Sequence, residues 1–239
     1  MANLQLFITP EKGKRLIARG LISRADVSGA LREHTVVIVA GTTNGYLAEE
    51  AVRYLGLSGF ERNGFIRGIL TPPGSATKSP AEPVDMVIEK GQWRRGSTIY
   101  DVSETLGPDD LIFKGANAVY AEDHSAGVLV AHPQSGTMAA AAAAVIGRRV
   151  TLIHPVGLEK RVIRPVGELA GHANAKEATG LRLYPSPGIA YTELDALYDL
   201  YGVRAQLIAA GGIEGYQGGY LLSCDGEEER LADLQAQFG

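Results

Sequence analysis

Polar and flexible residues follow four apolar runs of the sequence, each at the point where the run ends. These segments are Gly41 to Gly45, Lys114 to Asn117, His132 and His154. Continuous β-branched and apolar runs are typical of strands that are buried on both faces of a parallel sheet. Ligands of such sheets bind outside the carboxyl ends of the strands, where loops and helix N-termini converge. We therefore expect the four segments to lie along one edge of the sheet and to form a single site.

The turn Gly41-Thr42-Thr43-Asn44-Gly45 lies between an expected strand over 35–40 and an expected helix over 46–55. Free backbone amides, two hydroxyl groups and the positive end of a helix dipole are what a phosphate or carboxylate group requires. An ordinary helix cap made by Thr43 or Asn44 is the alternative. The turn matches neither the G-x-G-x-x-G fingerprint nor the P-loop pattern, so we expect neither NAD nor ATP, and no cofactor.

Lys114, Gly115 and Asn117 follow directly on the apolar run 110–113. A charge at the end of a buried strand either reaches solvent in a crevice or meets an anion. We therefore expect Lys114 to supply positive charge to a ligand and Asn117 to orient its polar groups.

A second potential anion cradle, Ser135-Gly136-Thr137, opens the alanine-rich helix expected over 137–146. It would use the same backbone amides and helix dipole. The alternative is that Ser135 or Thr137 is a plain N-cap. The alanines let the helix sit close to a neighbouring element and carry no chemistry of their own.

Three further side chains, His132, His154 and Glu159, are candidates for an acid, a base or a nucleophile. Histidine changes its charge near neutral pH, which suits proton transfer. The structural alternatives are a hydrogen-bonded histidine at a strand end and a surface ion pair between Glu159 and Lys160. No spacing of histidines or cysteines predicts a metal site, and the single cysteine, Cys224, excludes an internal disulfide.

The order of apolar runs and helical patterns predicts an α/β protein with a mainly parallel, Rossmann-like sheet and helices on both faces. The main domain would span 1–165, and a small ferredoxin-like β-α-β-β-α domain would span 175–239. Only 13 residues separate the runs 110–113 and 127–131, which barely suffices for a parallel crossover. If the second run is antiparallel, His132 leaves the shared edge.

Residues 57–83 are rich in glycine, proline and serine, with the densest part over Thr71 to Thr77. We expect a long excursion there with one short strand over 65–70. Long loops in compact domains are often functional.

The composition excludes several classes of protein. The chain has 239 residues, 45% of them apolar, and a net charge of −4, which is typical of a globular protein and speaks against nucleic acid as a partner. No apolar stretch reaches the roughly 18 residues of a membrane span, and the N-terminus lacks a secretory pattern. We therefore expect a cytoplasmic protein that does not bind membranes and that forms a homo-oligomer, since symmetric oligomers are common.

The run Val36 to Ala40 followed by Gly41 to Asn44 resembles the phosphate loop of the ribose-phosphate isomerases, whose fold glucosamine-phosphate deaminases and CoA transferases share. The segment 110–119 is similar to the isomerase strand that ends in Asp-Gly-Ala-Asp-Glu. The small α/β domain expected beside the main one is a further similarity. The resemblance covers about residues 30–165 and implies the fold and an anion-binding turn.

The catalytic carboxylates of those isomerases are not matched. Their positions hold Lys114, Asn117 and Ala118 in this chain, and the stretch 132–144 offers no carboxylate where the isomerases carry a glutamate base. The groups that would move protons are therefore missing, and ribose-phosphate isomerisation is not expected.

We accordingly predict a protein that binds a small anion, a sugar phosphate or a CoA ester, through Gly41 to Asn44, Lys114 and Asn117. One alternative is an isomerase or transferase with altered machinery that uses His132, His154 or Glu159. The other is a non-catalytic regulatory module whose C-terminal part contacts a partner. Fold alone does not decide among them.

Overall fold

The computed structural model describes residues 2–68 and 84–238, and its central element is a mixed sheet. The strands, in spatial order, are β10 (Ile189–Tyr191), β8 (Thr151–Pro155), β5 (Leu111–Phe113), β2 (Thr35–Ile38), β3 (Met86–Glu89) and β4 (Gln92–Arg94). β10, β8, β5 and β2 run parallel to one another, whereas β3 is antiparallel to β2 and β4 is antiparallel to β3.

The α/β class is confirmed, but the prediction of a mainly parallel sheet is wrong. Lys90 and Gly91, between β3 and β4, both have positive φ, 47° and 79°. This is the backbone of a tight two-residue hairpin, which brings β4 back antiparallel beside β3. Because β3 also opposes β2, its first residue lies at the edge where the parallel strands end.

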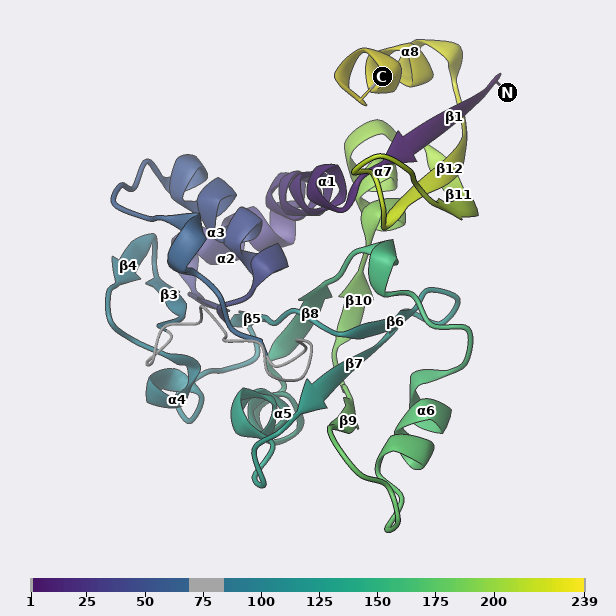
Figure 1. Cartoon of the computed structure of the whole chain (residues 1–239). Helices are drawn as coiled ribbons and strands as arrows, with labels where there is room; N and C mark the ends of the chain where they lie inside the picture. The colour runs from purple at the N-terminus through teal and green to yellow at the C-terminus, as the bar shows by residue number, and fades with distance from the viewer. Residues whose placement is uncertain (1, 69–83, 239) are drawn as a thin grey trace.

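Helices cover both faces of this sheet (Figure 1). On one face lie α1 (Pro10–Ser23), α2 (Ala25–Glu33) and α3 (Thr42–Leu55), and on the other lie α4 (Ile99–Val102) and α5 (Gly136–Arg148). Residues along β2 alternate between the two cores: Val36 and Ile38 pack with the first group, and Val37 packs with the second. This double burial explains the continuous apolar run in the sequence.

Helix α1 begins with two residues that favour a helix start, a threonine cap and a proline in the first turn. Pro10 is its first residue, and the Thr9 hydroxyl accepts a hydrogen bond from the Lys12 amide at 3.3 Å. Helix α1 continues past Gly20 to Ser23. A Cβ atom at Gly20 would lie 2.8 Å from that of Ala196, so this glycine allows close helix packing rather than ending the helix.

A second sheet consists of β6 (Ala118–Tyr120), β7 (Ser125–Val130) and β9 (Arg182–Pro185), all antiparallel to their neighbours. The short connection between the runs 110–113 and 127–131 contains the β6–β7 hairpin. Strand β7 therefore belongs to this second sheet and not to the parallel one. Helix α6 (Val166–Ala173) packs on this sheet through Val166 and Ala170, which contact Leu183.

The C-terminal part does not form a ferredoxin-like unit of its own within the described residues. β12 (Gly219–Gly226) pairs with β11 (Arg204–Gly211) on one side and with the N-terminal strand β1 (Ala2–Ile8) on the other, while β9 and β10 join the other two sheets. Helices α7 (Glu193–Tyr201) and α8 (Glu228–Phe238) accompany this third sheet. The division into domains 1–165 and 175–239 stays a prediction.

The long excursion over 57–83 is described in part. It contains the short helix η1 (Arg62–Gly64), and residues 65–68 form no strand. The rest, including Thr71 to Thr77, lies outside the described residues. Among the helices that are described, none is long and apolar enough to cross a membrane.

Candidate functional site

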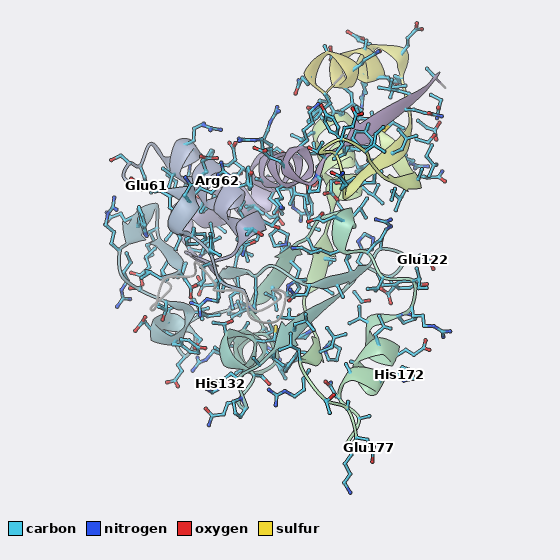
Figure 2. All side chains as sticks on the ribbon, in the orientation of Figure 1. Glu61, Arg62, Glu122, His132, His172 and Glu177 are labelled. Carbon is cyan, nitrogen blue, oxygen red and sulfur yellow. The ribbon has the colours of Figure 1, made fainter. Side chains whose placement is uncertain are left out.

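Three of the four predicted segments reach the same edge of the central sheet. In the strand register, Ile38 pairs with Phe113, and Phe113 pairs with Ile153. The residues at the ends of β2, β5 and β8 therefore lie side by side at the same edge of the sheet. They are the N-terminus of α3, Lys114 and the residues from His154 onward. His132 does not join them, because it follows β7 of the second sheet. It is exposed on the outside of the molecule, well apart from Arg62 (Figure 2).

The N-terminus of α3 has no side-chain cap, so the alternative role of Thr43 or Asn44 as an ordinary cap is not observed. The Asn44 amide instead donates to the carbonyl oxygens of Val39, at 2.7 Å, and Phe113, at 3.0 Å. These bonds tie the helix start to the ends of β2 and β5. The Thr43 hydroxyl and the Asn44 side-chain oxygen are buried with no hydrogen-bond partner among the described residues. Gly41 is half-buried and Thr42 is exposed beside them.

Lys114 is buried at the end of the central strand β5, with 7% of its surface exposed. Within the described part of the chain its ammonium group makes neither a hydrogen bond nor an ion pair. The pKa of Lys114 is lowered to about 8, mainly by burial and also by the positive charge of Arg67, whereas the negative charge of Asp85 opposes both. Among the described residues, Asp85 is the carboxylate whose charge acts on this ammonium group.

Asp85 is buried at the same edge and is already fully engaged. Its carboxylate accepts hydrogen bonds from the Ala40 amide at 2.9 Å, the Ile99 amide at 2.9 Å and Arg67 at 3.1 Å. The Ala40 bond places Asp85 beside the turn that leads into α3. Asp85 is a site residue that the sequence did not reveal, because it precedes an antiparallel strand.

His154 holds the backbone of Lys114 in place. Its Nδ1 donates to the Lys114 carbonyl oxygen at 2.5 Å, which leaves Nε2 to accept from the Ser186 hydroxyl at 2.6 Å. The ring is completely buried, and this burial lowers the pKa of His154 to about 4. The imidazole is therefore neutral at physiological pH and positions Lys114.

A second group of ionisable side chains lies at the carboxyl ends of β8 and β10. Glu159 and Lys160 belong to the short helix η2 (Leu158–Lys160), and Glu193 is the first residue of α7. Glu193 is completely buried and accepts hydrogen bonds from the Tyr220 hydroxyl at 2.6 Å and the Leu158 amide at 2.9 Å. The pKa of Glu193 is raised to about 7, mainly by burial and also by the charge of Glu159.

Two glycines make room for this group. A Cβ atom at Gly157 would collide with the Glu159 carboxylate and would lie 2.8 Å from Oε1 of Glu193. A Cβ atom at Gly13 of α1 would collide with Glu193 from the other side and would lie 2.5 Å from the Tyr220 hydroxyl. The two carboxylates therefore converge on one point, enclosed by η2, α1, α7 and β12.

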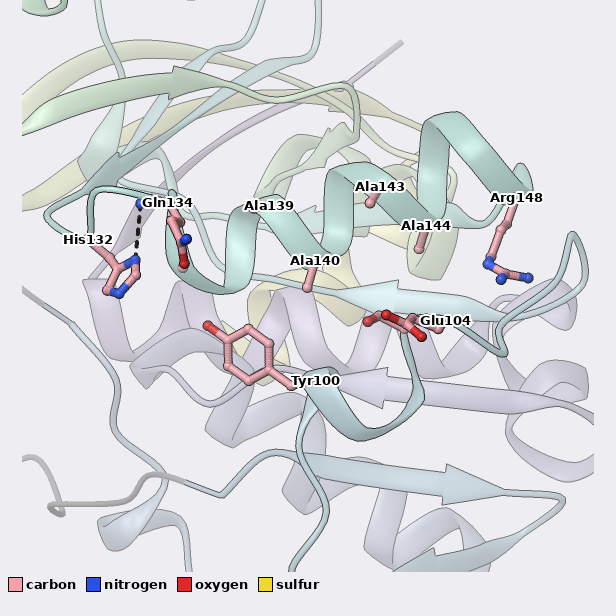
Figure 3. A pocket seen from close by; sticks show the side chains of 11 residues that line it. Tyr100, Glu104, His132, Gln134, Ala139, Ala140, Ala143, Ala144 and Arg148 are labelled. Atoms are coloured by element: carbon pink, nitrogen blue, oxygen red, sulfur yellow. Dashed lines mark hydrogen bonds between the residues drawn. The ribbon is translucent and has the colours of Figure 1, made fainter.

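The remaining predicted site residues lie elsewhere. Ser135, Gly136 and Thr137 form the start of α5, again with no side-chain cap. A hollow of about 570 Å³ lies between α4 and α5, and both His132 and Gly136 line it. Figure 3 shows Tyr100 facing the alanines of α5 across this hollow, with Glu104 and Arg148 toward its other end.

Gly115 and Asn117 connect β5 to the second sheet. The Asn117 side-chain oxygen accepts from the Leu129 amide at 3.0 Å, and the Asn117 amide donates to the Gly127 carbonyl at 2.8 Å. Asn117 thus fixes the β6–β7 hairpin, and its role toward a ligand stays a prediction. Gly115 is half-buried next to Lys114.

No group of three or more histidine, cysteine, aspartate or glutamate residues with the geometry of a metal site occurs among the residues that the structure describes. Comparison with known proteins gives no match, whether with family models, with curated proteins or with solved structures.

Proposed function

We propose that this protein binds a small phosphorylated or carboxylated metabolite at the carboxyl ends of β2 and β5. The observation that carries the proposal is Lys114, a buried ammonium group with no partner in the described part of the chain. An unpaired buried charge is costly, so its presence is best explained by an anionic ligand that pairs with it.

The electrostatics around Lys114 support an anion. Lys114 and Arg67 bring two positive charges to this edge, whereas Asp85, the carboxylate that acts on Lys114 among the described residues, already accepts three hydrogen bonds. The uncapped start of α3 adds backbone amides and the positive end of a helix dipole. The Thr43 hydroxyl offers a further hydrogen bond to a ligand oxygen.

The class of ligand follows from the resemblance described above. A sugar phosphate and a CoA ester both carry phosphate groups that this edge would accept, and both bind proteins of the resembled superfamily. A homo-oligomer stays a prediction that the single chain leaves open.

The test is a thermal-shift screen of the purified protein with inorganic phosphate, sugar phosphates, CoA esters and carboxylic acids. A ligand at about 100 times its dissociation constant should stabilise the wild-type protein by roughly 2.7 kcal/mol. We expect Lys114→Met to abolish this shift. The unliganded variant should be at least as stable as the wild type, because the apolar side chain removes a buried charge.

Lys176→Met is the matched control, since Lys176 is exposed and lies outside the site. It should keep the ligand-induced shift. Absence of a shift with every compound, or an equal shift in Lys114→Met, would show that no anion binds at Lys114.

A further inference from the structure

Lys114 offers a ligand an amine that can form a covalent bond as well as a positive charge. We propose that Lys114 forms a Schiff base with a carbonyl group of the metabolite that binds at this edge of the sheet. The inference rests on the proposed anion site and deepens it by naming the substrate class, which is a small ketone or aldehyde that also carries a carboxylate or phosphate group.

The backbone of Lys114 is held in one position. Its amide donates to the Ile153 carbonyl oxygen at 3.1 Å, and its own carbonyl oxygen accepts a hydrogen bond of 2.5 Å from Nδ1 of His154. The carbonyl oxygen of the preceding residue, Phe113, accepts from the Asn44 side-chain amide at 3.0 Å. Contacts from β8 and α3 thus fix the main chain from which the amine extends, and a nucleophile requires such a fixed support.

The side chain of Lys114, in contrast, has no partner among residues 2–68 and 84–238. Only 7% of the residue is exposed, and its ammonium group makes neither a hydrogen bond nor an ion pair there. Asp85, whose charge acts on Lys114, instead accepts hydrogen bonds from Arg67 and from the amides of Ala40 and Ile99. The amine is therefore available to a ligand.

The surroundings of Lys114 also favour the uncharged amine, which is the form that attacks a carbonyl group. The pKa of Lys114 is lowered to about 8, mainly by burial and also by the charge of Arg67, and Asp85 opposes this shift. The ring of His154, which packs from β8, is neutral. At pH 7.5 the uncharged fraction is then about 200-fold larger than for a lysine of ordinary pKa. Burial and a neighbouring cation are the conditions that activate lysines for Schiff-base formation.

The presence of lysine rather than arginine at this position supports the same conclusion. Arginine binds carboxylates and phosphates through two parallel hydrogen bonds and does not lose its proton, so it suits a site that only binds anions. Arg67 already brings a guanidinium group to this edge. Lys114 adds what Arg67 cannot supply, an amine that can lose a proton and bond to carbon.

The anionic part of the ligand has its own partners beside Lys114. The start of α3 has no side-chain cap, and Asn44 ties it to the end of β5. Its free backbone amides and the positive end of its dipole can hold a carboxylate or phosphate group. The Thr43 hydroxyl, which is buried without a partner in the described chain, is a further donor. Binding of the anionic group turns the attack of the amine into a reaction within one complex, which favours it strongly.

The proposed step balances, with water as its by-product. The uncharged Nζ atom of Lys114 adds to the carbonyl carbon, so a C–N bond forms and the π electron pair of the carbonyl moves onto oxygen. The oxygen then leaves as water, with one proton from the amine and one from the solvent. The product is a positively charged iminium ion, so its nitrogen still attracts the carboxylate or phosphate group of the ligand.

The experiment is reductive trapping on the full chain. Wild-type protein is incubated at pH 7.5 with sodium cyanoborohydride and with pyruvate, 2-oxoglutarate, acetoacetate or dihydroxyacetone phosphate, and binding of each probe is measured in parallel by thermal shift. Reduction of the imine leaves a stable adduct that adds the mass of the probe less one oxygen atom. We expect at least one probe that binds to give a single adduct per chain, which peptide mass spectrometry locates on Lys114.

Two variants control for reaction at other lysines. Lys114→Met should lose the adduct, and Lys176→Met, which removes an exposed lysine, should be labelled like the wild type. A probe that binds but leaves Lys114 unlabelled would overturn the Schiff base and leave the anion site intact. Labelling that is equal in Lys114→Met and in the wild type would also overturn the Schiff base, as would the absence of an adduct with all four probes.

A comparison of pyruvate with acetone separates the Schiff base from the anion site. Acetone has a methyl group where pyruvate has its carboxylate, so it reacts with the amine without using the anion site. The ratio of the two labelling rates on Lys114 should exceed the ratio measured on Nα-acetyl-lysine by about 10-fold or more, and inorganic phosphate should lower it. Equal ratios, with Lys114 labelled, would support the Schiff base and overturn the anion site.

Discussion

Asp85→Ala should lower the free energy of unfolding by about 3 to 5 kcal/mol, the usual cost of removing one partner from a buried charged network. The change would leave the amides of Ala40 and Ile99 without acceptors in a buried place. It would also remove the carboxylate that balances Arg67 and Lys114. Two unpaired backbone donors and the loss of negative charge beside Lys114 act in the same direction, so we expect this to be among the most damaging single changes at the site.

The measurement is urea unfolding of the wild type, Asp85→Ala and Asp85→Asn at one pH. The asparagine variant retains Oδ1, which serves Ala40 and Arg67, but places an amide group against the Ile99 amide. It should lose about 1 to 3 kcal/mol, less than the alanine variant. Asp109→Ala is the control, because Asp109 is exposed, and it should stay within about 0.5 kcal/mol of wild type. A loss below about 1 kcal/mol in Asp85→Ala would contradict the network.

The part of the site that lies on parallel strands could be predicted from the sequence. β2 and β5 are buried on both faces, so each appears as a continuous apolar run, and the residues after each run lie at one edge. That reasoning placed Gly41 to Asn44 and Lys114 together. It failed for His132, because the 11 residues 114–124 connect β5 to β7 through the β6–β7 hairpin instead of a helical crossover.

Asp85 and Glu193 could not be found in the same way. Asp85 precedes β3, and only the antiparallel pairing of β3 with β2 brings it to the carboxyl edge. Glu193 follows β10, a strand of three residues whose apolar pattern merges with the helix after it. Its neighbours also come from distant parts of the chain, since Gly13, Leu158 and Tyr220 lie in α1, η2 and β12. Such contacts leave no local signal in a sequence.

The pairing of β1 with β12 shows the same limitation for the fold. Leu4 lies opposite Cys224, and Ile8 lies opposite Tyr220, more than 200 residues along the chain. The order β-α-β-β-α predicted after residue 175 omits β10 but contains the other strands and helices, and so it suggested a unit of its own. The partner that completes its sheet was the N-terminal strand, which had not been recognised.

The pH dependence of stability should identify Glu193 as a group that prefers to be protonated in the folded protein. Its pKa is raised from 4.5 to about 7 by burial and by the charge of Glu159. Above pH 4.5 the unfolded chain releases this proton, whereas the folded chain holds it up to about pH 7. Folding is therefore favoured by this group at low pH, and the contribution is lost as the pH rises to 7. The loss should amount to about 3 kcal/mol.

Glu193→Gln removes the titration while keeping the shape of the side chain. Its stability relative to wild type should therefore rise by about 3 kcal/mol between pH 4.5 and pH 7, and should stay constant above that range. Urea unfolding of both proteins across this range gives the difference directly. The pKa of His154 is lowered to about 4, so the fold loses stability as the pH falls below 6.5. This loss is the same in both proteins and cancels in the difference between their free energies of unfolding. A difference that does not change with pH would mean that Glu193 is ionised in the folded protein at pH 5.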